Sequence, residues 1–261
     1  MMQRLLVVTL LAFSTSCLAQ VRFSTLVVKK NEVYRLSPSD IIVADTLIMM
    51  DSSKIILNPL KTENFIRAGV VIIGNGCSIE GKGTNGTRGR NGIAGNTPIG
   101  PCQNGSAGRD GARGLDGTPG IKLFLYIDKI NAFGNLTVDL SGGNGGDGGN
   151  GGPGGGGSPG TNQCNGGNGG NGGNAGGGGN GGDGGVLTLG GKEARDLRKK
   201  VGSAFKVFTK AGTFGYGGIL GHAGPPGLGP NKRHGKPGMA GQDGQDGRPG
   251  TIGTILFENN Y

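Results

Sequence analysis

Glycine recurs at every third position in long blocks between Gly83 and Gly253, and no other feature limits the possible folds so strongly. The 261 residues include 62 glycines. Glycine adds no side chain to a core and loses more backbone entropy on folding than any other residue, so an ordinary globular core is excluded where it dominates. The period holds in six blocks, and its phase restarts between them. The blocks comprise residues 83–95, 105–120, 142–160, 166–185, 212–227 and 235–253.

A period of three matches the left-handed polyproline II helix, which has three residues per turn, a rise of about 3.1 Å per residue and no internal hydrogen bonds. Glycine at one position of each turn leaves one edge of such a helix bare, so that another backbone can approach. Two blocks, 142–160 and 166–185, carry glycine in two of the three columns, and Ala175 interrupts one of the two columns in the second block. Helices with two bare edges can have neighbours on both sides. We therefore expect these two blocks to be the middle layer of a three-layer bundle with two helices per layer.

Three other interpretations of the repeat fit less well. A collagen triple helix is disfavoured because the blocks are short, proline is sparse and the register restarts. Segments 142–147 and 178–183 match the opening of the calcium-binding nonapeptide repeat, but Gly149 and Gly185 stand where that repeat needs a large apolar residue. A disordered glycine linker explains neither the strict register nor the breaks that contain proline. We expect no metal ion and no cofactor.

The breaks between paired blocks predict three antiparallel hairpins whose tips lie at one end. The breaks at 96–104, 161–165 and 228–234 are rich in proline, glycine and asparagine, which form turns. Two of them hold a cysteine, so Cys102 and Cys164 would meet and form a disulfide if the hairpins stand side by side. Ten tip residues are candidate ligand contacts, although turn formation alone would also explain them. They are Pro98, Ile99, Gln103, Asn104, Thr161, Asn162, Asn231, Lys232, Arg233 and His234.

Short β-rich runs flank every hairpin and predict a mainly β framework, with almost no α-helix. They lie at 77–80, 123–127, 136–140, 186–189, 205–208 and 254–257, with further runs upstream at 46–50, 54–57 and 70–73. The framework is expected to be a small β-solenoid or sandwich, from which the six-helix polyglycine II bundle projects. One short helix is predicted over 192–201, where apolar residues share a face. The framework covers 20–80, 123–140, 186–211 and 254–261, and the hairpins cover 83–120, 142–185 and 212–253.

The N-terminus has the layout of a secretory signal peptide: Arg4, an apolar run at 5–13 and small residues up to Ala19. We expect cleavage after Ala19. Lipid attachment at Cys17 is the less favoured alternative, because the usual leucine is missing three residues before it. No later run is long enough to span a bilayer. The mature protein is therefore expected to be secreted or held at the cell surface.

The remaining composition disfavours catalysis and nucleic-acid binding. The mature chain would keep three cysteines, one pair and one lone thiol, with the lone Cys77 in strand-like sequence where an inert buried thiol is usual. Neither histidine has a plausible partnered nucleophile. The net charge of +9 is scattered among aspartates, and the basic stretch 192–200 lacks the interleaved aromatics of single-stranded nucleic-acid binders. We expect a protein that is not an enzyme and has no nucleic-acid partner.

The runs 142–157 and 166–185 resemble the polyglycine II bundle proteins, which include the snow flea antifreeze protein and the tip adhesins of T-even-like phage tail fibres. The resemblance implies a bundle that carries either a flat ice-binding face or receptor-binding loops at its tip. It covers 83–253 at most and rests on composition. A signal peptide and a β framework depart from the phage pattern, and so do tips without aromatic residues.

These features favour an adhesin or recognition protein. A rigid sandwich of about 40 to 60 Å would display the three tips to a cell-surface glycan or another surface receptor. The basic cluster 232–234 favours an anionic glycan or lipid head group. One alternative is an ice-binding protein, although the outward columns mix Arg88, Leu115 and Tyr216. Another is a structural surface or matrix protein that self-associates into a larger fibre.

Overall fold

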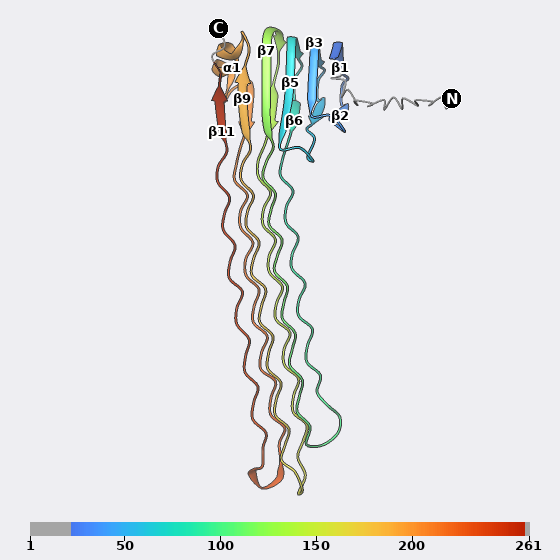
Figure 1. The fold of residues 1–261 in the computed structure, drawn as a ribbon, viewed down its shortest axis with the longest axis vertical. Coiled ribbons are helices and arrows are strands. Elements are labelled where there is room, and N and C mark those ends of the chain that lie inside the picture. The colour runs from blue at the N-terminus through green and yellow to red at the C-terminus, as the bar shows by residue number, and fades with distance from the viewer. Residues whose placement is uncertain (1–21, 259–261) are drawn as a thin grey trace, which may run out of the picture.

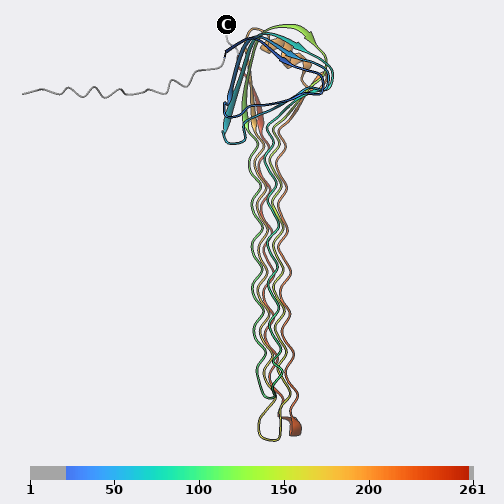
Figure 2. The same ribbon diagram turned by 90° about the vertical axis from the view of Figure 1, so that its right-hand side faces the viewer.

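The protein consists of a β head and a long stalk, shown in two orthogonal views in Figures 1 and 2. The computed structural model describes residues 22–258. The predicted signal peptide and Cys17 lie outside the described residues. The stalk leaves the head on one side and carries the glycine-rich segments, while both ends of the described chain lie in the head (Figure 1).

The head is a coil of parallel strands that alternate between two sheets. The six-stranded sheet has the order β1 (Arg22–Val28), β3 (Ile41–Met49), β5 (Glu63–Ile73), β7 (Lys122–Phe133), β9 (Val186–Gly190) and β11 (Thr254–Phe257). The five-stranded sheet has the order β10 (Phe205–Phe208), β8 (Leu136–Asp139), β6 (Cys77–Glu80), β4 (Lys54–Ile56) and β2 (Val33–Arg35). Every strand pair is parallel. Consecutive strands therefore fall in opposite sheets, which is the topology of a β-solenoid rather than a sandwich.

The core of the head is made of aliphatic side chains stacked in register from one coil to the next. Alternate residues of a strand point to the same face, and the strands show the matching alternation of buried and half-buried residues. One stack joins Ile42, Ile66, Leu125 and Leu189 through successive strand pairs. All four are at most 2% exposed. Each such burial stabilises the fold by about 1.5 to 3 kcal/mol.

Each glycine-rich excursion leaves the coil at the same kind of corner. The chain leaves after β6, β8 or β10 of the five-stranded sheet and returns at β7, β9 or β11 of the six-stranded sheet. Earlier coils close this corner with short loops, at 36–40 and 57–62. Because the three excursions are inserted into successive coils, they start side by side and one strand spacing apart.

The opposite corner between β9 and β10 carries the short helix α1 (Ala194–Lys200). The helix predicted over 192–201 is confirmed, although it begins two residues later and ends one residue earlier than predicted. Leu197 is fully buried and fixes the helix against the core.

Backbone hydrogen bonds join the glycine-rich segments at every third residue. We number the six glycine blocks given above as segments 1 to 6. A rung is a row of such bonds that crosses the stalk from one segment to the next, and one rung runs through all six segments. In it, the backbone N–H of each residue donates to the carbonyl oxygen of the residue before it in the series Arg90, Ala112, Gly149, Gly176, Gly218 and Gly244, at 2.8 to 3.0 Å. Further bonds join segment 3 to segments 1 and 5, as for Gly89 N–H to Asp147 O, and join segment 4 to segments 2 and 6. Segments 3 and 4 each bond four other segments.

Candidate functional site

The glycine columns of the stalk face backbone with no room for a side chain. A Cβ on Gly149 would overlap the carbonyl oxygen of Arg90, and a Cβ on Gly176 would overlap that of Ala112. Two glycines of the outward column differ. A Cβ on Gly156 would lie 3.4 Å from its nearest neighbour, and one on Gly177 would lie 3.3 Å from Gln245 O. Glycine is thus required by close backbone approach in the inner columns and is optional at these two outward positions.

Asparagine and aspartate in the outward column form ladders across the stalk. The side-chain oxygen of one segment accepts the N–H of the outward residue in the segment beside it, as when Asn91 Oδ1 accepts from Asn150 N (2.9 Å) and Asn150 Oδ1 accepts from Ile219 N (3.0 Å). The acceptors are Asn85, Asn91, Thr97, Asn104, Asp110, Asp116, Asn144, Asp147, Asn150, Asn168, Asn171, Asn174, Asn180 and Asp183.

Proline occupies ladder positions where the neighbouring segment offers no side-chain oxygen. Asn91 and Thr97 accept from Asn150 and Gly156, so the intervening Ala94 aligns with Pro153, which has no N–H to donate. Such an N–H would need another partner if it were present. The sequence analysis did not predict this role for the asparagines and aspartates. The signal was present, because asparagine and aspartate recur every third residue beside the glycine columns.

Asp183 is the side-chain acceptor of segment 4 that lies nearest the head. It accepts two hydrogen bonds from Thr251, one donated by the backbone N–H (2.7 Å) and one by the hydroxyl (2.8 Å). These bonds favour the carboxylate and lower the pKa of Asp183. Since the folded-state pKa lies below the unfolded one, the carboxylate stabilises the stalk at neutral pH. That contribution is lost as the pH falls through the lowered pKa.

Replacing Asn150 by alanine removes one rung acceptor and leaves Ile219 N–H without its partner. We expect a loss of about 1 kcal/mol of stability, because solvent replaces part of the bond. Asn150→Asp keeps an acceptor oxygen, as Asp147 does naturally, and is the matched control. Hydrogen–deuterium exchange of segment 5 measures the effect, with faster exchange near Ile219 in Asn150→Ala alone. Equal exchange in both variants would contradict the role of the ladder.

The three tips meet at the end of the stalk farthest from the head (Figure 1). Cys102 and Cys164 form a disulfide with 6.0 Å between their Cα atoms, which confirms the predicted pair. Cys102 N–H also bonds Pro159 O (2.8 Å), and Gly160 N–H bonds Leu228 O (2.8 Å), so the second tip is tied to both others. Cys77 is the free, buried cysteine of the described chain.

The predicted ligand contacts divide into exposed loop residues and residues that build the stalk. Ile99 is fully exposed at 103%. Arg233 Nη1 donates to Asn162 O at 3.4 Å, and His234 Nδ1 accepts the N–H of Gly229 at 3.1 Å. Gln103 and Asn104 bond Ser158 and Asn168 and so belong to the last rung of the stalk. The third tip is a single 3-10 turn at Pro230–Lys232, in which Asn231 and Lys232 have φ of 53° and 64°.

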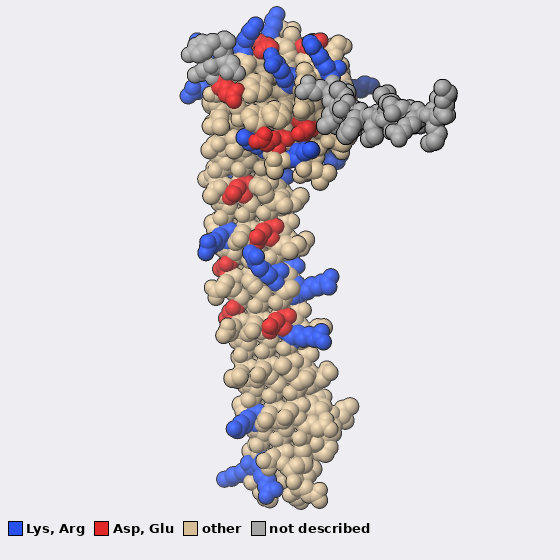
Figure 3. Space-filling model, in the orientation of Figure 1, with Lys and Arg blue, Asp and Glu red and all other residues tan. Residues whose placement is uncertain are grey.

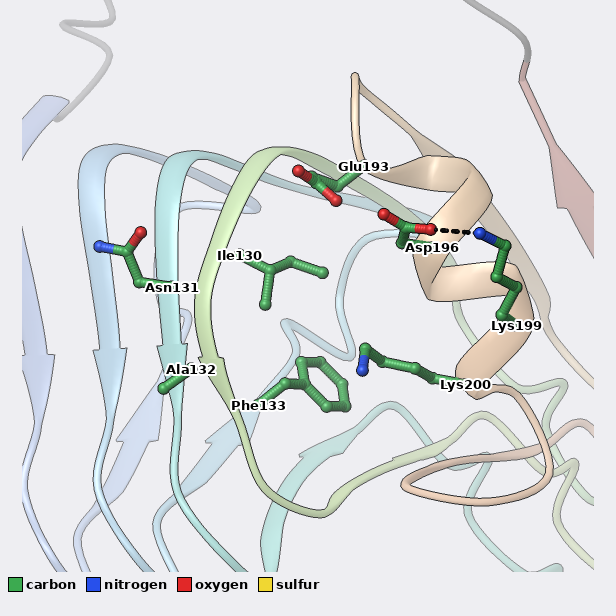
Figure 4. Close-up of a pocket in the computed structure, with 8 residues that line it drawn as sticks. All are labelled: Ile130, Asn131, Ala132, Phe133, Glu193, Asp196, Lys199 and Lys200. Carbon is green, nitrogen blue, oxygen red and sulfur yellow. Dashed lines mark hydrogen bonds and ion pairs between the residues drawn. The ribbon is translucent and has the colours of Figure 1, made fainter.

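A second candidate site is an open pocket of about 390 Å³ between β7 and α1, shown in Figure 4. Its charged groups largely compensate one another. Lys199 donates to Asp196 at 2.7 Å and lowers the pKa of that carboxyl, and the Lys200 ammonium lies 5.6 Å from the centre of the Phe133 ring. The tips, by contrast, carry unpaired cations and exposed apolar side chains. We therefore take the tips as the candidate functional site.

Comparison with known protein families, curated proteins and solved structures found no match. Among residues 22–258, no helix has the length and apolar character needed to cross a membrane. Within the same range, no group of three or more histidine, cysteine or acidic residues is arranged to hold a metal ion.

Proposed function

We propose that the stalk is an antiparallel bundle of six polyglycine II helices, arranged as three hairpins in three layers. The hydrogen bonds at every third residue support this assignment, because three residues make one turn of that helix. Segments 3 and 4 bond four neighbours each, as the middle layer requires. A helix without internal hydrogen bonds is held only by its neighbours, so the bundle would act as one rigid rod.

We further propose that the protein is a secreted or cell-surface recognition protein without enzymatic activity. In this proposal the rod presents the three tip loops to a cell-surface glycan or another surface ligand. The observation that supports this proposal most directly is that three loops from distant parts of the chain lie together at one end of the stalk. The Cys102–Cys164 disulfide links the first two of them. Junction residues Ile121 (7% exposed) and Leu140 (0%) anchor the rod in the core of the head. A loop set held this way loses little entropy on binding, which favours affinity.

The test is binding to intact cells by the wild type and by the double variant Lys232→Ala, Arg233→Ala. Rim cations contribute mainly through long-range attraction, so we expect at least about tenfold weaker binding at low salt. The matched control is Arg90→Ala, Arg109→Ala, which removes the same charge from exposed positions on the stalk. Equal binding by all three proteins would remove the tips from the proposal.

A further inference from the structure

We propose that the tip docks on an anionic phospholipid bilayer, with Ile99 and Leu228 entering the interface and the cations of the third tip pairing with phosphates. This inference rests on the proposed function, since it names the ligand class of the same tip. It concerns lipid itself rather than a glycan on the cell surface.

Two aliphatic side chains stand exposed in the tip loops. Ile99 is 103% exposed and Leu228 is 69% exposed. They belong to different tips, and the second tip lies between them, since Gly160 N–H bonds Leu228 O and Cys164 bonds Cys102. Aliphatic side chains at the end of a rod that meets a surface end-on are placed to enter a bilayer interface.

The tip also carries cations without acidic neighbours in sequence. Lys232, Arg233 and Lys236 lie within five residues of one another, and the three tip breaks contain no aspartate or glutamate. In Figure 3 the basic side chains at the far end of the stalk have no red neighbour on the visible face, whereas charges of both signs mix farther up. Basic residues near an anionic leaflet are attracted within a Debye length.

The backbone of the third tip points to a use for Lys232. Its φ of 64° is a left-handed conformation, which glycine adopts without steric cost and lysine does not. A glycine would suit this turn better, in a chain where glycine is the commonest residue of the stalk. A lysine there contributes its side chain, since its backbone preference opposes the turn.

The side-chain chemistry favours lipid over glycan. The tip breaks contain no tyrosine, phenylalanine or tryptophan, so they lack the large aromatic side chains that line small-molecule pockets. Their one imidazole, that of His234, accepts the N–H of Gly229. Exposed aliphatic groups combined with cations instead match the two forces that hold proteins at anionic interfaces, buried apolar area and attraction to acidic head groups.

Vesicle co-sedimentation tests this inference with the full chain in oxidised form. The vesicles contain phosphatidylcholine alone or with about one third phosphatidylglycerol. We expect the wild type to pellet with the anionic vesicles only and to be released by high salt. The pair Lys232→Ala, Arg233→Ala should lower the apparent affinity about 30-fold, and Ile99→Ser, Leu228→Ser by about tenfold or more. Lys232→Gly should weaken binding while leaving the turn intact.

Matched variants on the stalk separate a tip effect from a general one. Arg90→Ala, Arg109→Ala and the exposed aliphatic change Ile93→Ser should bind vesicles like the wild type; Ile93 is 65% exposed. The inference would be overturned if the stalk variants lost as much vesicle binding as the tip variants. It would also be overturned if the wild type did not bind anionic vesicles. If the wild type ignores vesicles but still binds cells through Lys232 and Arg233, only the lipid inference fails. If it binds neither, the proposed function fails as well.

Discussion

Replacing Gly176 by alanine is expected to disrupt the stalk, whereas the same change at the adjacent Gly177 is expected to be tolerated. A Cβ on Gly176 would overlap the carbonyl oxygen of Ala112, and Gly176 N–H holds the rung to Gly149 (2.8 Å). Overpacking of a site without free space costs about 3 kcal/mol, and here it also pushes segment 4 away from segment 2. At Gly177 the added carbon would lie 3.3 Å from Gln245 O and 4.0 Å from Gln245 N, which requires a shift of only a few tenths of an ångström.

Hydrogen–deuterium exchange of the stalk amides measures the effects of these two substitutions. Gly176→Ala should speed the exchange of amides in all six segments, because its rung runs through all of them. Gly177→Ala should match the wild type, and the amides of β5 and β7 should stay protected in both proteins. If the two alanine variants behave alike, close backbone packing does not explain the glycine columns.

Removing the tip disulfide is expected to have the second largest effect. The bond links residues 62 positions apart in the chain, and cross-links of this span stabilise proteins by about 2 to 4 kcal/mol. In the double variant Cys102→Ser, Cys164→Ser, the first tip keeps only hydrogen bonds to the second hairpin, such as Cys102 N–H to Pro159 O and Gln103 N–H to Ser158 Oγ. We expect earlier unfolding in urea and faster proteolysis within 96–104.

The control for this variant is the wild type under reducing conditions, which should behave like the double serine variant. Reduction should not add to the effect of the substitutions, since Cys77 is free and buried. A double variant as resistant to protease and urea as the oxidised wild type would show that the tips are held together without the bond.

Much of the fold could be predicted from local sequence patterns. The strands at 77–80 and 205–208 match β6 and β10, and the cysteine pair followed from the position of both residues in hairpin breaks. These predictions succeeded because each depends on residues close together in the chain. The length of β5 and β7 was underestimated, since Lys129 and Arg67 interrupt their apolar pattern where the strands face solvent.

The arrangement of the strands could not be read from the sequence. Parallel pairing joins β6 to β8 across an entire hairpin, from Cys77 to Leu136, and no local pattern encodes such a distant partner. The hydrogen-bond partners of Asn91 and Asn150 could not be predicted for the same reason. Their partners are set by the offset between two hairpins, which is known only once the corners of the coil are placed.

The distance between the head and the tip tests the central claim, that the glycine-rich segments form one rigid rod. Leu60 lies beside the start of the stalk and is 89% exposed, and Ile99 lies at the tip. Spin labels on Leu60→Cys and Ile99→Cys can be attached without reducing the disulfide, and double electron–electron resonance then reports their separation. The account predicts one narrow distribution near 45 Å, from about fifteen residues at 3.1 Å each. A broad distribution, or one centred at a much shorter distance, would contradict it.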